Sequence, residues 1–99
     1  MDIGVHHQKL SKVDNESLRL LIVRAINSNQ LLILKNIDGE SSITTTIKHI
    51  AKITGIPIST LKLNYRILKE IGLLKTDNVG LHSVKLTRLG KLVIDILGE

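Results

Sequence analysis

The sequence contains no Cys, Phe or Trp, and Tyr65 is its single aromatic residue. The lack of Cys excludes disulfide bonds and thiolate chemistry, which fits a reducing cytoplasm. One aromatic residue gives single-stranded nucleic acid no platform on which its bases could stack. The sequence also lacks a Gly-rich phosphate loop, a nucleophile elbow and a paired-carboxylate arrangement. We therefore expect a protein that is not an enzyme and that uses no cofactor.

Long apolar runs are missing as well. The most apolar region, residues 18–37, is interrupted by Arg19, Arg24 and the polar run NSNQ at 27–30. A membrane span needs about 20 uninterrupted apolar residues, so we expect no membrane partner. The first 14 residues are polar and do not have the pattern of a signal peptide. With 99 residues and 42% hydrophobic content, the chain suffices for one domain with a small core.

Positive charge is concentrated in one part of the chain. Residues 48–91 hold nine Lys or Arg against two acidic residues, Glu70 and Asp77, a net charge of +7. The other residues carry five basic and seven acidic side chains, which leaves the whole chain at +5. This asymmetry favours a polyanionic partner, although lysines on solvated helix surfaces would explain it equally well.

The N-terminal part predicts a tail and a helix. Residues 1–13 show no periodicity, so we expect a flexible tail before a domain that spans residues 14–99. Asp14 and Asn15 are N-cap candidates for a helix that ends near Ile26, and a buried strand is the competing interpretation. Because this segment is apolar on more than one face, we expect it to be buried on more than one side.

The polar tetrad NSNQ at 27–30, which follows this segment, predicts a break before a second helix at about residues 29–37. Leu31, Leu34 and Ile37 recur there at spacings of three, as on the inner face of a helix. A loop around Gly39 ends it.

The segment TGIPISTLKLNYRILKEIGLL, residues 54–74, joins two helical patterns through only three residues. Gly55 is suited to end the first helix in a left-handed conformation. Pro57 lacks a backbone donor, which would be unpaired at a helix start in any case. We therefore predict a helix-turn-helix at about residues 44–71, whose second helix projects from the body. The expected inner residues are Ile47, Ile50, Ala51, Thr54, Leu61, Tyr65, Leu68, and Ile71 or Gly72.

After Gly72 the hydrophobic period changes from that of a helix to that of a strand. We expect a two-stranded wing at about residues 73–86, with a turn at 77–80. Thr87 is suited to cap a final helix at about residues 87–97. The predicted fold class is mainly α with a small β-hairpin.

From about Asn29 to Leu97, the chain resembles the winged helix-turn-helix domain of the MarR, ArsR and PadR regulators. The resemblance rests on IKHIAKITGIPISTLKLNYRILKEIGLL and on VKLTRLGKLVIDIL, with its Leu-Thr-x-x-Gly element. It implies a recognition helix at 58–71 in the major groove of double-stranded DNA, and a wing along the backbone or minor groove. The composition is also similar to that of compact regulators from thermophilic archaea and their viruses and plasmids.

The outward side of the recognition helix supplies the expected DNA contacts. Lys62 and Arg66 can donate to guanine O6 and N7, and Asn64 can pair with adenine. Ser59 and Thr60 lie in the first turn, where unpaired amides and hydroxyls favour phosphate. The full set of expected contacts is Ser59, Thr60, Lys62, Leu63, Asn64, Arg66, Lys69, Lys48, Lys52, Lys75, Lys85 and Arg88.

Some features depart from the resemblance. Pro57 stands where a Ser cap is common, and the wing-tip sequence DNVG has no Arg for a deep minor-groove contact. Leu63 and Ile67 form an apolar strip: Leu63 could meet a thymine methyl group, or the strip could pack against another chain or against the ribbon. A winged-helix module that binds a protein partner is therefore the alternative function.

The apolar surface of helices 17–26 and 88–97 exceeds what one small core can absorb. We therefore expect a homodimer that regulates transcription by binding a pseudo-palindromic site, with recognition helices about 34 Å apart. We expect no metal, because the adjacent His6 and His7 lack further ligands nearby, and no small-molecule ligand. His49 and His82 are expected to be surface residues.

Overall fold

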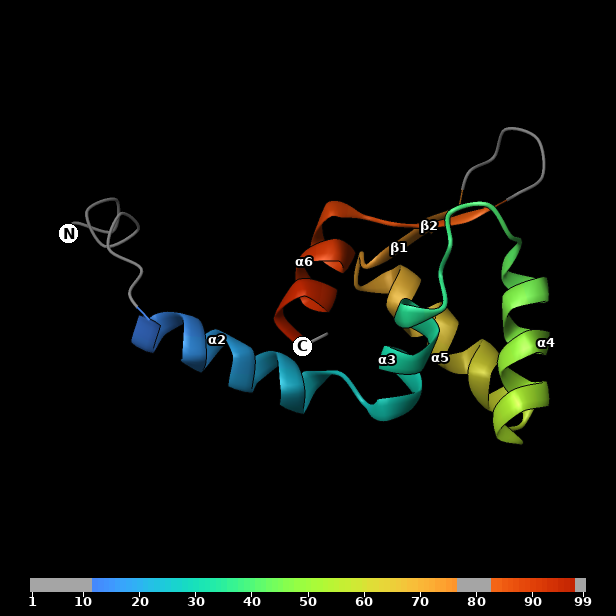
Figure 1. Cartoon of the computed structure of the whole chain (residues 1–99), viewed down its shortest axis with the longest axis horizontal. Helices are drawn as coiled ribbons and strands as arrows, with labels where there is room; N and C mark the ends of the chain where they lie inside the picture. Colours follow the sequence, from blue (N-terminus) through green and yellow to red (C-terminus); the bar gives the residue numbers. More distant parts are fainter. Residues whose placement is uncertain (1–11, 77–82, 98–99) are drawn as a thin grey trace.

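The computed structural model describes residues 12–76 and 83–97, which form five helices and a two-stranded antiparallel sheet (Figure 1). This architecture confirms the predicted fold class. The elements are α2 (Lys12–Ala25), α3 (Ser28–Lys35), α4 (Ile43–Thr54), α5 (Ile58–Glu70), β1 (Leu74–Thr76), β2 (Val84–Leu86) and α6 (Arg88–Leu97). Within these ranges, no helix has the length and apolar character needed to cross a membrane. The predicted turn of the wing at 77–80 and most of the predicted tail lie outside the described residues.

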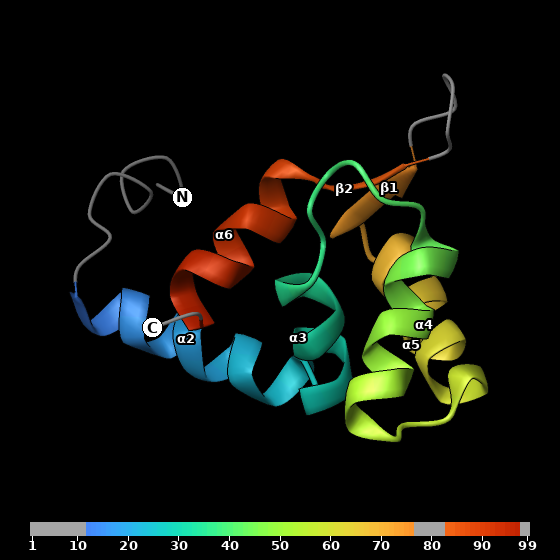
Figure 2. The same ribbon diagram turned by 45° about the vertical axis from the view of Figure 1, so that its right-hand side comes forward.

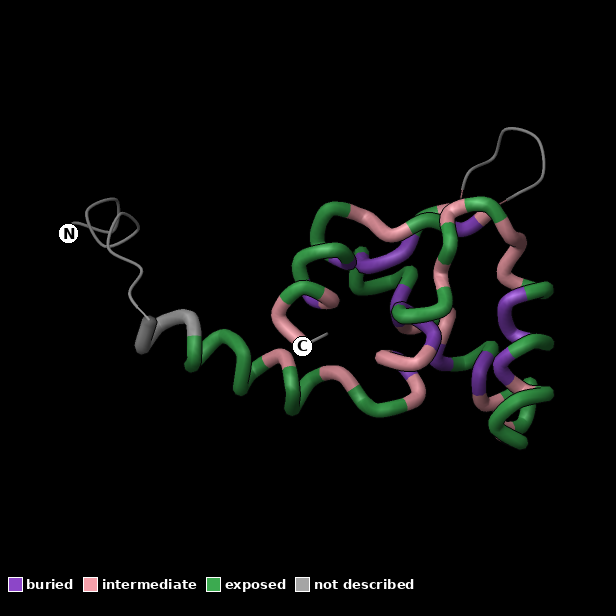
Figure 3. Tube along the Cα trace, viewed as in Figure 1, coloured by how far each residue is buried: buried purple, intermediate pink, exposed green. Residues whose placement is uncertain are grey.

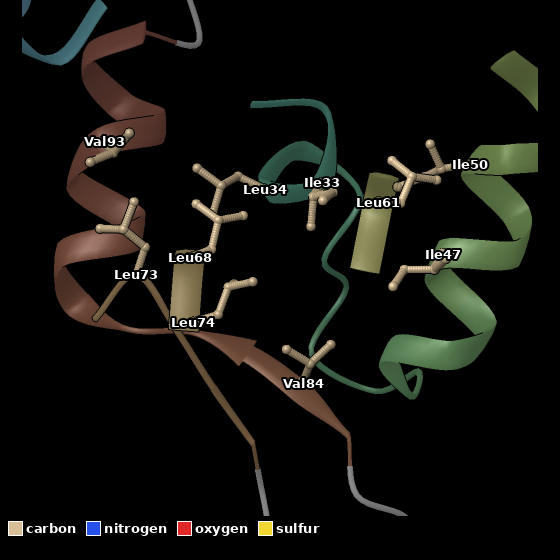
Figure 4. Packing of buried hydrophobic residues seen from close by; sticks show 10 residues of the cluster. All are labelled: Ile33, Leu34, Ile47, Ile50, Leu61, Leu68, Leu73, Leu74, Val84 and Val93. Atoms are coloured by element: carbon tan, nitrogen blue, oxygen red, sulfur yellow. The ribbon is translucent and has the colours of Figure 1, made fainter. Parts of the chain in front are cut away.

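The hydrophobic core lies among α3, α4, α5, α6 and the sheet, whose side chains turn toward one another (Figure 4). Leu61 and Leu68 on the inner side of α5 are 0% exposed, as their spacing predicts. Tyr65 is partly buried on the same side, and its hydroxyl lies 3.2 Å from that of Thr76 in β1. The buried apolar residues of the described chain are Ile33, Leu34, Ile47, Ile50, Leu61, Leu68, Leu73, Leu74, Val84 and Val93.

The turn between α4 and α5 follows the sequence prediction closely. Ser42 caps α4, and its hydroxyl accepts a hydrogen bond from the amide of Thr45 at 3.2 Å. Gly55 ends α4 at φ +79°, and its amide donates to the carbonyl of Ala51 at 2.9 Å. Pro57 is the N-cap of α5 and makes no side-chain capping bond. Because α4 ends at Thr54 and α5 begins at Ile58, the short turn between them sets α5 beside α4 (Figure 2). Thr54, expected on the inner face, is exposed at the end of α4.

The end of α5 directs the chain into the wing. Gly72, at φ +86°, donates its amide to the carbonyl of Lys69, and the amide of Leu73 donates to the carbonyl of Leu68. This pair of bonds is the Schellman arrangement, which satisfies the last carbonyls of a helix. It sends Leu73 into the core and leaves Ile71 49% exposed and Gly72 exposed as well, so the prediction that Ile71 or Gly72 faces inward is wrong.

The start of α6 explains the Leu-Thr-x-x-Gly element. The Thr87 hydroxyl accepts from the amide of Gly90 at 3.0 Å, which confirms the predicted cap, and it also donates to the carbonyl of Gly72. A Cβ atom on Gly90 would lie 2.2 Å from the carbonyl oxygen of Leu73. Only glycine therefore lets α6 pack this closely on the chain that leaves α5.

Helix α2 differs from the rest of the molecule. It extends away from the body, and it contacts α6 where the Nη1 of Arg19 donates to the carbonyl of Ile96 at 2.6 Å (Figures 1 and 2). Leu21 is 67% exposed, and residues 16–25 of this helix are mostly exposed (Figure 3). The prediction that this helix is buried on more than one side is therefore wrong for the single chain.

The start of α2 also differs from the prediction. The helix begins at Lys12, so Asp14 and Asn15 lie inside it instead of capping it. Residues 12 and 13 accordingly belong to the helix and not to the tail.

Candidate nucleic-acid interface

Helix α5 presents a polar and cationic side to solvent. Ser59, Lys62, Arg66 and Lys69 are exposed there, and Leu63, between them, is 52% exposed. The opposite side of the helix carries Leu61 and Leu68 into the core between α3, α4 and the wing. The helix is thus held firmly along its inner side while its outer side remains open. Thr60 is only half-buried, in the first turn.

Asn64 does not belong to the outer side of α5, so the prediction of an outward Asn64 is wrong. The residue is 7% exposed, and its Oδ1 accepts from Asn27 Nδ2 at 3.1 Å and from Gln30 Nε2 at 3.2 Å. Its Nδ2 donates to the carbonyl of Thr60 at 2.9 Å. Its amide oxygen therefore ties α5 to the start of α3.

The partners of Asn64 were missed because the NSNQ tetrad predicts only a break between helices. Asn27 is the N-cap of α3, and its side chain forms a reciprocal capping box with Gln30. A polar residue at the inner spacing of one helix, matched by a capping amide on another, is the signal that could have identified this contact. Buried polar groups are almost always hydrogen-bonded.

Three cationic residues of α5, Lys62, Arg66 and Lys69, border a groove of about 490 Å³ against the first turns of α4. We call them the α5 cluster. The Nζ of Lys69 lies 5.7 Å from the ring centroid of Tyr65, within the range of a cation–π contact. Among the described residues that line this groove, Glu70 is the one acidic residue against three cationic residues, so the net charge of these residues is positive. Its other lining residues are Ile43, Thr44 and Ile47.

The expected phosphate contacts on α4 are Lys48 and Lys52. Both are exposed, as is His49, which agrees with their predicted place opposite the inner residues of this helix. Ile53 is exposed on α4 as well.

A second cationic group lies on the wing. Lys75 and Lys85 are partners in the antiparallel register of β1 and β2, and Lys91 of α6 joins them around a hollow of about 340 Å³. We call these three lysines the wing cluster. The wing hollow and the α5 groove share no lining residue, so the α5 cluster and the wing cluster are two separate groups. Arg88 is exposed in the first turn of α6 and lines neither hollow.

Asp38 lines the wing hollow and organises the loop before α4. Its carboxylate accepts hydrogen bonds from the amides of Ser41 and Glu40 and from the Ser41 hydroxyl, at 2.7–2.8 Å. These bonds lower the pKa of Asp38 from 3.8 to about 2, and the bond from the Ser41 amide contributes most to this shift. The carboxylate is therefore charged at neutral pH and offsets part of the charge of the wing cluster.

The same loop connects the wing to α4. The amide of Val84 donates to the carbonyl of Ser41 at 3.2 Å, and Ser42 forms a β-bridge with Ser83. Ser42 thus contacts the wing and caps α4 at once.

A helix-turn-helix followed by a short antiparallel ribbon and a closing helix defines a winged-helix-like domain. Residues 14–90 match the family model of the Firmicute plasmid replication protein (RepL). The match covers most of the chain, and the chain belongs to the RepL family. No curated protein and no solved structure matches it.

The family match supports a winged-helix-like domain of the DNA-binding type. It corrects the finer resemblance, because the matched family is RepL and not the MarR, ArsR or PadR regulators. Its description also names Firmicute plasmids, which gives no support to the expected archaeal or thermophilic type.

Proposed function

We propose that this protein binds a specific duplex sequence with the outer side of α5 in the major groove. The observation that carries the proposal is the exposed α5 cluster on a helix whose inner side is fixed in the core. An α-helix is about 10–12 Å across with its side chains, which matches the width of the major groove. The proposed role is binding, with no chemical step.

The side chains of α5 divide the work of recognition. Lys62 and Arg66 donate to guanine O6 and N7 and supply base preference. Ser59 and Thr60, in the first turn, donate to phosphate, where the helix dipole also favours negative charge. Phosphate contacts that position the protein without reading sequence come from Lys48, Lys52, Lys69, Lys75, Lys85 and Arg88.

The family name suggests where the bound duplex lies. A plasmid replication protein that recognises a specific duplex would bind within the plasmid's replication region. Binding there could also regulate transcription of nearby genes, the narrower role that the sequence predicts. The proposal for this chain is recognition of the replication region, with any effect on transcription as a consequence of occupancy.

We also propose that the protein acts as a homodimer. The exposed apolar residues of α2 and α6 lie on two helices that contact each other, which makes them one candidate surface for a second copy. Two-fold symmetry would then place two α5 helices about 34 Å apart on a pseudo-palindromic site. The apolar residues concerned are Leu18, Leu20, Leu21, Val23, Leu89 and Leu92.

The test of specific binding is selection of bound duplexes from a random pool, followed by affinity measurements with single variants. Arg66→Ala should weaken binding by about 1–3 kcal/mol and relax the preference at one base pair. Lys35→Ala removes an exposed cation from α3 that lines neither hollow, and it should leave base preference intact. Equal affinity for all duplexes, unchanged in Arg66→Ala, would contradict sequence-specific recognition.

The salt dependence of binding distinguishes DNA from a protein partner. Each phosphate contact contributes a slope of about −0.9 in a plot of log affinity against log salt for B-form DNA. Lys48→Ala and Lys75→Ala each remove one expected phosphate contact, so each should reduce the magnitude of that slope by about 0.9. Binding that is insensitive to salt would favour the alternative of a protein-binding module.

A further inference from the structure

The outermost line of α5 is polar except at its centre. Ser59, Leu63, Arg66 and Glu70 follow one another at spacings of four, three and four, so they share one stripe of the helix. All four are exposed, and Leu63 occupies the middle of the stripe. A large apolar side chain is therefore held at the part of α5 that would enter a groove first.

The surroundings of Leu63 are cationic. Lys62 precedes it, Arg66 lies one turn further, and both border the α5 groove. An apolar protein surface that covered Leu63 would have to cover these two charges as well. Burial of unpaired charges is costly, so a purely apolar partner does not fit this stripe.

The major groove of DNA offers the matching combination of groups. The C5-methyl of thymine is the apolar group that a base pair presents there, and phosphates run along both sides of the groove. The methyl group can pack against Leu63 while the flanking cations remain near phosphates or base acceptors. The apolar side chain of Leu63 thus matches the thymine methyl group, and the cations beside it match the phosphates on either side of the groove.

The position of Asn64 removes the usual competitor for this base pair. An outward Asn would read the adenine of a T·A pair through N6 and N7. The Asn64 amide is instead engaged with Asn27, Gln30 and the carbonyl of Thr60. Contact between Leu63 and the thymine methyl is a direct means of recognising the pair that does not need an outward Asn.

We propose that Leu63 is a specificity-determining residue that recognises the methyl group of a thymine at the centre of each bound half-site. The proposal rests on the function proposed above and adds the base that is read. It predicts a T·A pair under the middle of α5, flanked by the guanines that Lys62 and Arg66 contact.

The test uses the full chain and a duplex selected from a random pool. Each thymine is replaced in turn by deoxyuridine, which pairs with adenine in the same way but lacks the methyl group. At the thymine that meets Leu63, the replacement should raise Kd about fourfold, which corresponds to about 0.8 kcal/mol for one buried methyl. In Leu63→Ala, the thymine and deoxyuridine duplexes should bind alike.

Ile71→Ala is the matched control, because Ile71 is an exposed apolar residue at the end of α5 and off the outer stripe. It should preserve the fourfold difference. The inference is overturned if no deoxyuridine changes the affinity, or if the loss persists in Leu63→Ala. It is also overturned if Leu63→Ala reduces the number of chains in the free protein, since Leu63 would then be covered by a second copy. If no duplex is selected at all, the proposed function itself fails.

Discussion

Helix α2 and the body formed by α3–α6 contain the same kinds of apolar residue in opposite environments. Leu61 of the body is completely buried, whereas Leu21 of α2 is two-thirds exposed. In the body, the apolar sides of several helices and the wing meet at one core. Helix α2 contacts the body at its α6 side, so most of its apolar surface finds no counterpart among the residues that the structure describes. An apolar segment therefore predicts burial, but it does not say which molecule provides the cover.

The largest effect on stability should come from the centre of the body. Leu61→Ala removes a fully buried side chain and leaves a cavity, so the free energy of unfolding should fall by about 2–5 kcal/mol. Leu63→Ala, two residues further on the same helix, should change it by less than about 0.5 kcal/mol because the side chain is exposed. Denaturant titration of both variants measures the difference, and equal losses would contradict the burial assigned to α5.

A smaller effect is expected from the amide contact between α3 and α5. Asn64→Ala leaves the side-chain donors of Asn27 and Gln30 without their acceptor, so the free energy of unfolding should fall by about 1–3 kcal/mol. Base preference, measured on the folded protein, should be unchanged. Loss of preference at an adenine without loss of stability would restore the outward role that the sequence predicts for Asn64.

The smallest effect on the stability of the single chain should come from α2. The double variant Leu20→Ser with Leu21→Ser alters exposed positions, so at concentrations where chains are separate the unfolding free energy should change by less than about 0.5 kcal/mol. If α2 is covered by a second copy, the same variant should convert dimers into monomers in sedimentation experiments.

Arg24→Ser is the control for that experiment, because Arg24 is an exposed polar residue on the same helix. It should leave the sedimenting mass unchanged. A wild-type protein that sediments as a single chain would contradict the dimer and leave the exposed surface of α2 to another partner.

The sequence predicts the body well because its local signals agree with its packing. Gly55 and Pro57 define one turn, Thr87 caps α6, and the three-to-four spacing of Leu61 and Leu68 identifies the inner side of α5. Each of these features depends on interactions within a few residues or on a single periodicity, which a single sequence displays directly.

The two main errors concern partners that are distant in the chain. The residue type of Asn64 favours an outward position. Its place near the inner side of α5 instead lets it bond to Asn27 and Gln30, which are 37 and 34 positions away in the chain. The apolar residues on more than one face of α2 predict its burial, but such a pattern carries no information about where a counterpart lies. The placement of the wing lysines relative to α5 is likewise a tertiary property.

The double role of Ser42 has a consequence for how the protein would approach a ligand. Because this residue caps α4 while it pairs with Ser83 at the wing, the ribbon cannot swing outward without loosening the first turn of the neighbouring helix. The wing and the helix-turn-helix should consequently dock as one rigid piece, so that their contacts form or fail together. A DNA site that matches only the helix-turn-helix or only the wing would therefore lose the contacts of both and bind weakly.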